Sequence, residues 1–155
     1  MRGLYHAALS VYMDRFLNVP PARLPEASKV DSLPRDADEL CRLLLETLDR
    51  HADYEEPTAL VARYVRLGHP LPKLIDALTL ATVREDLDFH ALQVLEAAVR
   101  QMEGGCDEAR CEHLFVGVVR QLSAFCPTPR AGHHIATIAK RLQRGEKMYE
   151  EDDGD

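Results

Sequence analysis

Apolar residues recur every three or four positions along most of this chain, which is the spacing of amphipathic helices. The longest stretch of this kind, Pro70–Met102, predicts one central helix of about 30 residues. Shorter stretches predict five further helices, over Gly3–Leu17, Asp36–His51, Pro57–Gly68, Asp107–Phe125 and Thr128–Lys147. No segment of useful length alternates with the period of two that a strand requires. We therefore predict an all-α fold, with about six helices in a single bundle-like domain.

Breaker and capping residues set the expected ends of these helices. Asp36 and Glu39 have the spacing of an N-cap with a reciprocal acidic partner. Gly68 occupies a position where helices commonly end. The segment Asn18–Pro34 contains four prolines, so we expect an extended connector there. The domain is expected to span residues 1–149, followed by a disordered acidic tail over residues 150–155.

Two polar stripes run along nearly opposite sides of the predicted central helix, at about 100° per residue. One stripe contains Lys73, Arg84, Asp88 and Ala91, and the other contains Thr79, Asp86, His90 and Gln93. The first stripe has mixed charge and is the natural solvent face. We therefore expect the second stripe to face the interior of the protein or a cleft, between flanks rich in leucine, isoleucine and valine.

Asp86 and His90 are the first candidates for chemistry. They are four residues apart, which places their side chains about 6 Å from each other on one helix face. Two interpretations are open. The pair forms a hydrogen bond on the helix surface, or it shares a metal ion with the carboxylate as ligand or as partner of the imidazole. The expected interior position of the stripe is what favours a metal.

Glu85 and Glu96 lie on the apolar side of the same predicted helix, where a buried charge is unfavourable unless it is paired. They are either partners of buried arginines or carboxylate ligands of a metal site in a helical bundle. Candidate arginines for the first interpretation are Arg15, Arg63, Arg100 and Arg141. In a catalytic scheme, Glu85 or Asp86 supplies the carboxylate, and Arg141 contacts an anion or a metal ligand.

Three more histidines join this set. The helical spacing places His6 on the apolar face of the first helix and His134 at the flank of the apolar stripe of the last one. His69 is expected at the start of the central helix, where the positive end of the helix dipole favours a neutral imidazole. The remaining histidines, His51, His113 and His133, are expected to be exposed. Inward histidines from several helices, with adjacent acids, are a pattern that builds non-haem metal sites.

The predicted metal ligands are therefore His6, His69, Asp86, His90 and His134. Because this set offers nitrogen and oxygen rather than thiolate, iron or manganese is favoured over structural zinc. Such an ion in a dry cavity would activate bound oxygen or water. These ligands predict a non-haem oxidase or oxygenase-type component that acts on a small organic substrate.

Charge and cysteine content limit the partners, the cellular location and the cysteine chemistry that we expect for this chain. Its 19 basic and 26 acidic residues give a net charge of -7, which argues against binding to nucleic acid. No apolar run approaches the roughly 18 residues of a membrane span, and no signal peptide is recognisable, so a cytoplasmic protein without membrane contact is expected. The four cysteines form no C-x-x-C pair, so neither a disulfide framework nor a zinc site is expected. Cys41 and Cys126 should pack in the core, and Cys106 and Cys111 flank a turn.

Three stretches, Gly3–Pro25, Gly68–Glu96 and His134–Tyr149, resemble helical segments found beside Rieske-type iron-sulfur domains in bacterial proteins. The His-Pro pair at position 69, followed by a long helix, is also similar to questin-oxidase-like helical oxygenases. The resemblance implies a role in oxidative metabolism. Its matching positions are His69, Glu85, Asp86 and His90. The chain has no Rieske cluster motif of its own, so the resemblance implies an electron-donor partner such as a Rieske-type ferredoxin.

A second interpretation requires no reaction. The polar stripe of the central helix would then be a docking groove or a hydrogen-bonded core network of a non-catalytic helical protein-interaction module. A third interpretation is that Met1–Leu17 begins inside a helix because the chain is part of a longer protein, or because it forms an obligate homo-oligomer in which another subunit completes the helix. The unfolding of such an oligomer would depend on concentration. These interpretations remain open at the level of the sequence, and so does the question of whether the chain is an enzyme.

Overall fold

The computed structural model describes residues 2–14, 16, 23–50 and 54–146 of the chain. These residues form eight α-helices and no strand, which confirms the all-α class but exceeds the predicted six helices. The helices are α1 (Arg2–Asp14), α2 (Ala27–Asp31), α3 (Ala37–Asp49), α4 (Glu55–Arg66), α5 (Leu71–Val83), α6 (Phe89–Glu103), α7 (Glu108–Phe125) and α8 (Ala131–Gln143). The predicted tail over residues 150–155 lies outside the described residues.

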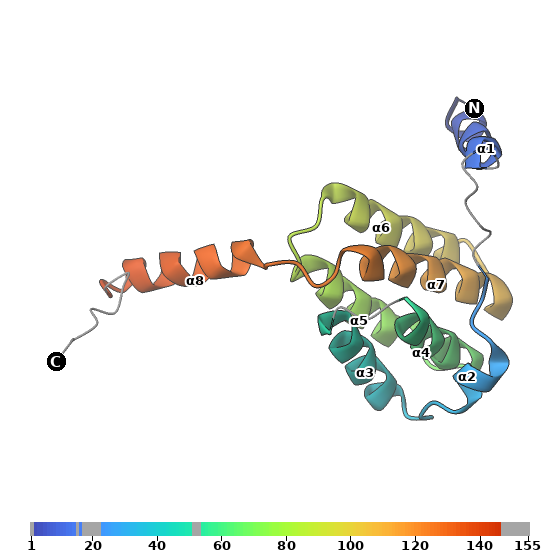
Figure 1. Cartoon of the computed structure of the whole chain (residues 1–155), viewed down its shortest axis with the longest axis horizontal. Coiled ribbons are helices and arrows are strands. Elements are labelled where there is room, and N and C mark those ends of the chain that lie inside the picture. The colour runs from blue at the N-terminus through green and yellow to red at the C-terminus, as the bar shows by residue number, and fades with distance from the viewer. Residues whose placement is uncertain (1, 15, 17–22, 51–53, 147–155) are drawn as a thin grey trace.

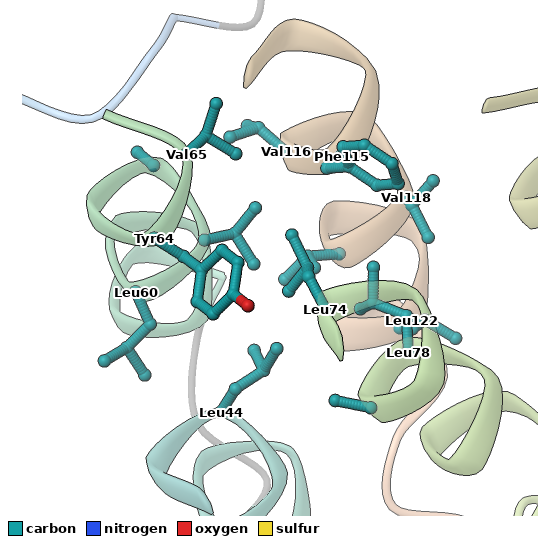
Figure 2. Packing of buried hydrophobic residues seen from close by; sticks show 14 of the residues in the cluster. Leu44, Leu60, Tyr64, Val65, Leu74, Leu78, Phe115, Val116, Val118 and Leu122 are labelled. Carbon is teal, nitrogen blue, oxygen red and sulfur yellow. The ribbon is translucent and has the colours of Figure 1, made fainter. Parts of the chain in front are cut away.

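Helices α2 to α7 pack around one hydrophobic core, with α4 and α7 side by side at its centre (Figure 1). Helix α3 packs against α4, α6 packs against α7, and α5 contacts both α3 and α6. The amphipathic stripes predicted for α3, α4 and α7 all contribute to the core. Leu44, Leu60, Tyr64, Phe115 and Leu122 are among its fully buried side chains (Figure 2). The buried Tyr64 hydroxyl donates to the carbonyl oxygen of Pro70 at 2.8 Å, so its polar atom is satisfied.

Predicted helix ends are confirmed where a local signal exists. The Asp36 side chain accepts a hydrogen bond from the backbone N–H of Glu39 at 2.9 Å and so caps α3. Asp107 caps α7 in the same way, by accepting from the N–H of Arg110 at 2.8 Å. Gly68 has a φ of 70°, which is the left-handed conformation in which helices commonly end.

The prediction of one long central helix is wrong, because the chain turns between α5 and α6. Asp88 has an extended backbone (φ -74°, ψ 174°), and its side chain accepts from the N–H of His90 at 3.0 Å. An N-cap of this kind starts a new helix, so the two halves fold into a hairpin and both bury an apolar face. The helical phase is lost at the turn. The stripe of Thr79, Asp86, His90 and Gln93, which was expected to face inward, is exposed at all four residues, whereas Ala91 is buried.

The segment expected to be an extended connector contains α2, a short helix whose Val30 is fully buried. Arg63 of α4 holds this region in place. Its guanidinium donates to the Asp31 carboxylate at 3.0 Å and to the carbonyl oxygen of Pro34 at 3.3 Å. The proline content therefore limited the length of the helix here but did not prevent one.

Helices α1 and α8 lie outside the core, which contradicts the expected inward orientation of their apolar faces. Figure 1 shows α8 extending from one end of the core and α1 lying beyond the opposite end. No core helix packs along either of them. Ile135 and Leu142 of α8 are 64% and 51% exposed. The apolar stripes were identified correctly, but a stripe does not specify what covers it.

A disulfide joins Cys106 and Cys111, whose Cα atoms are 5.9 Å apart, a pairing that the sequence did not predict for the two cysteines flanking this turn. Cys41 and Cys126 are free and buried, which confirms their predicted place in the core. Within the described ranges, no helix combines the length and the apolar character needed to cross a membrane.

Candidate functional site

The loop between α5 and α6 meets the segment between α7 and α8 at a buried carboxylate. The Glu85 side chain has no exposed surface. One of its oxygens accepts from both the N–H and the hydroxyl of Thr128 at 2.7 Å, and the other accepts from Arg130 Nε at 2.8 Å. The salt-bridge interpretation of Glu85 is thus confirmed. The partner is Arg130, which is not one of the four arginines considered from the sequence.

Arg130 and Arg84 alternate with two carboxylates in this cluster, which we call the α8 junction and which comprises Asp49, Arg84, Glu85, Asp86, Thr128 and Arg130. Arg130 also donates to Asp49, and Arg84 donates to the same Asp49 carboxylate at 2.7 Å. Arg130 has a φ of 53°, a left-handed conformation that costs a non-glycine residue roughly 1–2 kcal/mol. The three charged hydrogen bonds that its guanidinium donates to Glu85 and Asp49 hold it there.

The cluster perturbs the protonation of its members. Burial by itself would raise the pKa of the Glu85 carboxyl, but the hydrogen bonds from Arg130 and Thr128 outweigh burial and hold that pKa below its usual value. The hydrogen bonds of Arg130 to Glu85 and to Asp49 raise the pKa of its guanidinium, which remains a cation. Burial, together with the nearby Glu85, raises the pKa of Cys126 to about 11, so its thiol is neutral and a poor nucleophile at pH 7.

Asp86 connects the core to α8 directly. Its carboxylate accepts from the N–H groups of Ala131 and Gly132, the latter at 3.1 Å, and so caps the first turn of α8 from another part of the chain. A Cβ on Gly132 would lie 3.2 Å from Asp86 Oδ1, which is closer than usual contacts. Glycine at position 132 therefore allows the carboxylate to approach. Asp86 is exposed and its contacts are those of a helix cap.

A surface pocket of about 360 Å³ opens at this junction. It is lined by Val83, Arg84, Glu85, Asp86, Arg130 and Gly132. Its charged groups are mainly engaged with one another, since each arginine pairs with two carboxylates. The arrangement is suited to fixing the direction in which α8 leaves the core.

The four histidines predicted as metal ligands lie in different parts of the molecule. His6 and His134 are exposed on α1 and α8, so the prediction that they point inward is wrong. His90 is exposed at the start of α6, with its Nδ1 3.2 Å from Gln93 Oε1. His69 is partly buried, with Nε2 2.8 Å from the carbonyl oxygen of Arg35 and its ring 5.0 Å from that of Tyr64. Asp86 precedes α6, so it does not share a helix face with His90.

The other predicted site residues make local contacts. Arg141 is partly exposed, and its Nε lies 3.5 Å from Glu146. Glu96 is exposed, so the prediction that it lies on a buried apolar face is wrong; it pairs at 2.6 Å with Arg100, one of the arginines considered from the sequence, on the surface of α6. His113 is exposed as expected, whereas His51 and the side chain of His133 lie outside the described residues.

In the part of the chain that the structure describes, no three histidine, cysteine, aspartate or glutamate side chains lie together in a way that could hold a metal ion. The predicted iron or manganese site, the oxidation of a small substrate and the electron-donor partner stay predictions. Elemental analysis of protein purified without chelator tests the first of them.

Exposed large apolar side chains are concentrated on α1 and the turn that follows it. Seven large apolar side chains there are 48% to 71% exposed: Leu4, Tyr5, Leu9, Val11, Tyr12, Met13 and Phe16. The helix buries none of these residues against the core. The sequence carried the signal for this surface, an amphipathic stripe, but the stripe was assigned to the interior.

Comparison with protein-family models, with curated proteins and with solved structures finds no match for this chain. The resemblance to helices beside Rieske-type domains and to questin-oxidase-like oxygenases therefore stays a prediction. The geometry of the two outlying helices and of the α8 junction is what bears on function.

Proposed function

We propose that this chain is a non-catalytic helical interaction module, which binds a protein partner through the apolar faces of α1 and α8. The observation that carries the proposal is the exposure of the α1 side chains named above, at 48% to 71% of their surface. The largest apolar patch on a typical monomer is about 300–600 Å² and is often a functional surface. An amphipathic helix that presents its apolar face is a common recognition element.

The α8 junction supports this role, because it presents α8 in a defined direction. Asp86 caps the first turn of α8. Arg130, the residue that immediately precedes α8, is held by Glu85 and Asp49. A binding element that is already ordered loses less conformational entropy when a partner binds. The buried charges of the junction thus have a structural purpose that requires no bound ion.

Site-specific photo-crosslinking in cells that produce the full chain tests the proposal. Benzoylphenylalanine is placed at Leu9 in α1 or at Ile135 in α8, and the matched control positions are Ser10 and Ala136, which are exposed on other sides of the same helices. We expect light-dependent protein adducts at positions 9 and 135 and none above background at the controls. Equal labelling at all four positions, or none at any, would contradict the module.

A further inference from the structure

Both outlying helices carry the same periodic apolar pattern. Tyr5, Leu9, Tyr12 and Phe16 follow one another at spacings of four, three and four residues, and we call this set the α1 seam. Ala131, Ile135, Ile138 and Leu142 follow at the same spacings and form the α8 seam. This is the heptad spacing with which helices pack in pairs. The backbone N–H of Phe16 bonds to the carbonyl oxygen of Met13 at 2.9 Å, so the turn continues to the end of the α1 seam.

We propose that the occupant of these faces is a second copy of this chain: α1 of each copy packs against α8 of the other, around a twofold axis. The inference rests on the proposed function and names its partner. Each of the two helices has 13 residues and the two seams have equal length, so they match along their whole extent. Because α1 and α8 lie at opposite ends of the molecule (Figure 1), a twofold axis creates two identical contacts and leaves neither seam uncovered.

The exposed area is of the size that a stable dimer needs. The three aromatic side chains of the α1 seam, Tyr5, Tyr12 and Phe16, are 50% to 69% exposed. Since an aromatic side chain presents about 150–250 Å², they offer roughly 350 Å² of apolar surface. Leu9, Ile135 and Leu142 are 51% to 64% exposed and add to this area. A specific interface buries at least about 500 Å² on each partner, and the two seams of one copy together reach that size.

The distribution of charge favours packing of α1 against α8 over packing of α8 against a second α8. Arg141 flanks the α8 seam beside Leu142, so two α8 helices packed seam to seam would bring like charges together. The sequence of α1 places formal charges at its two ends, at Arg2 and Asp14, and none along the seam between them. Pairing α1 with α1 would meet no such repulsion but would leave both α8 seams exposed. Only the reciprocal arrangement covers all four.

Sedimentation equilibrium of the full chain, from about 1 to 200 μM, tests the proposal against the chain mass of 17.5 kDa. We expect a dimer whose dissociation constant is at least a hundredfold larger in Leu9→Glu and in Ile135→Glu. The control variants Ser10→Glu and Ala136→Glu introduce the same charge on other sides of the same helices and should dimerise like the original chain. Circular dichroism checks that all four variants keep their helices.

Mixing the two seam variants tests the reciprocal pairing. Leu9→Glu retains an intact α8 seam and Ile135→Glu retains an intact α1 seam, so an equimolar mixture can form one complete α1–α8 contact. We expect the mixture to dimerise at least tenfold more tightly than either variant alone. No recovery in the mixture would overturn the proposed pairing.

A mass of one copy at every concentration would overturn the dimer. In that case the photo-crosslinking experiment tests whether the chain is an interaction module at all. Adducts with a different protein at positions 9 and 135 would support the proposed function with another partner. A monomeric mass together with no adducts of any kind at these positions would contradict both the proposed function and the dimer.

Discussion

Glu85 bears a full negative charge at a place that solvent does not reach. A carboxylate in such a position is tolerated only when hydrogen bonds and a counter-charge replace its water. Thr128 supplies two donors and Arg130 supplies the cation, and both come from the segment that leads into α8. The carboxylate therefore links the direction of α8 to the stability of the core.

Replacing Glu85 by glutamine should lower the free energy of unfolding by about 3 kcal/mol, because Arg130 and Arg84 lose the buried one of their two shared carboxylates and keep only Asp49. Urea denaturation followed by circular dichroism measures the change. Glu96→Gln is the matched control. Its partner Arg100 is on the surface, so the loss should stay below about 0.5 kcal/mol. Equal losses in the two variants would contradict the role assigned to the buried pair.

The stabilisation by Glu85 should also depend on pH. Its pKa in the folded state is below the ordinary value of 4.5, so the ionised form is favoured by folding. The contribution should be fully present above about pH 4.5 and lost as the pH falls through the lower, folded-state pKa. In a series of urea titrations, the stability difference between the original chain and Glu85→Gln should be constant from pH 8 to 5 and should shrink at lower pH. A difference that grows on acidification would contradict this assignment.

At the scale of residues, the sequence identified Glu85 as a charge on an apolar face but not its partners. That the charge had to be paired follows from desolvation alone. Arg130 is 45 residues away, and only the packing of α7 against α6 brings its segment to the α5–α6 loop. Arg84 was assigned to solvent because the stripe was drawn on a helix that does not continue. The periodic spacing of apolar residues predicts helices but does not predict which distant segments contact each other.

At the scale of elements, the break between α5 and α6 shows what periodicity can and cannot resolve. The apolar positions from Leu71 to Met102 fit one helical phase, so the pattern alone favours continuity. Asp88 contains the opposing signal, because its short carboxylate can satisfy a free N–H at the start of a helix. The same residue type at positions 36 and 107 did predict a start correctly, since breaker residues stand nearby.

Removing the cap of α8 should loosen that helix without affecting the core. Asp86→Ala deletes the acceptor for the N–H groups of Ala131 and Gly132, and such a cap is worth about 1 kcal/mol. Backbone amides of α8 should then exchange with solvent about fivefold faster, as measured by mass spectrometry at short exchange times. The amides of α4 and α7 should keep their rates. Asp76→Ala, at an exposed aspartate of α5, serves as the control and should change neither set.

At the scale of the whole molecule, the chain divides its apolar residues between a core and two outlying helices. The sequence predicted both amphipathic stripes correctly, yet placed α1 and α8 inside. The reason is that amphipathicity reports a face that avoids water, and a neighbouring copy can cover such a face as well as the same chain can. Core helices α4 and α7 were placed correctly because their stripes meet each other within one chain.

Thermal unfolding should therefore depend on protein concentration. Short helices such as α1 and α8 are marginal alone in water, and α8 is oriented by the folded core, so association should occur between folded chains and stabilise them by mass action. A hundredfold rise in concentration should raise the midpoint by roughly 3–5 °C for a chain of this size. Ile135→Glu should show no such rise, and Ala136→Glu should behave like the original chain. Scanning calorimetry at two concentrations makes the comparison, and a midpoint independent of concentration in all three proteins would argue that the two seams stay apart.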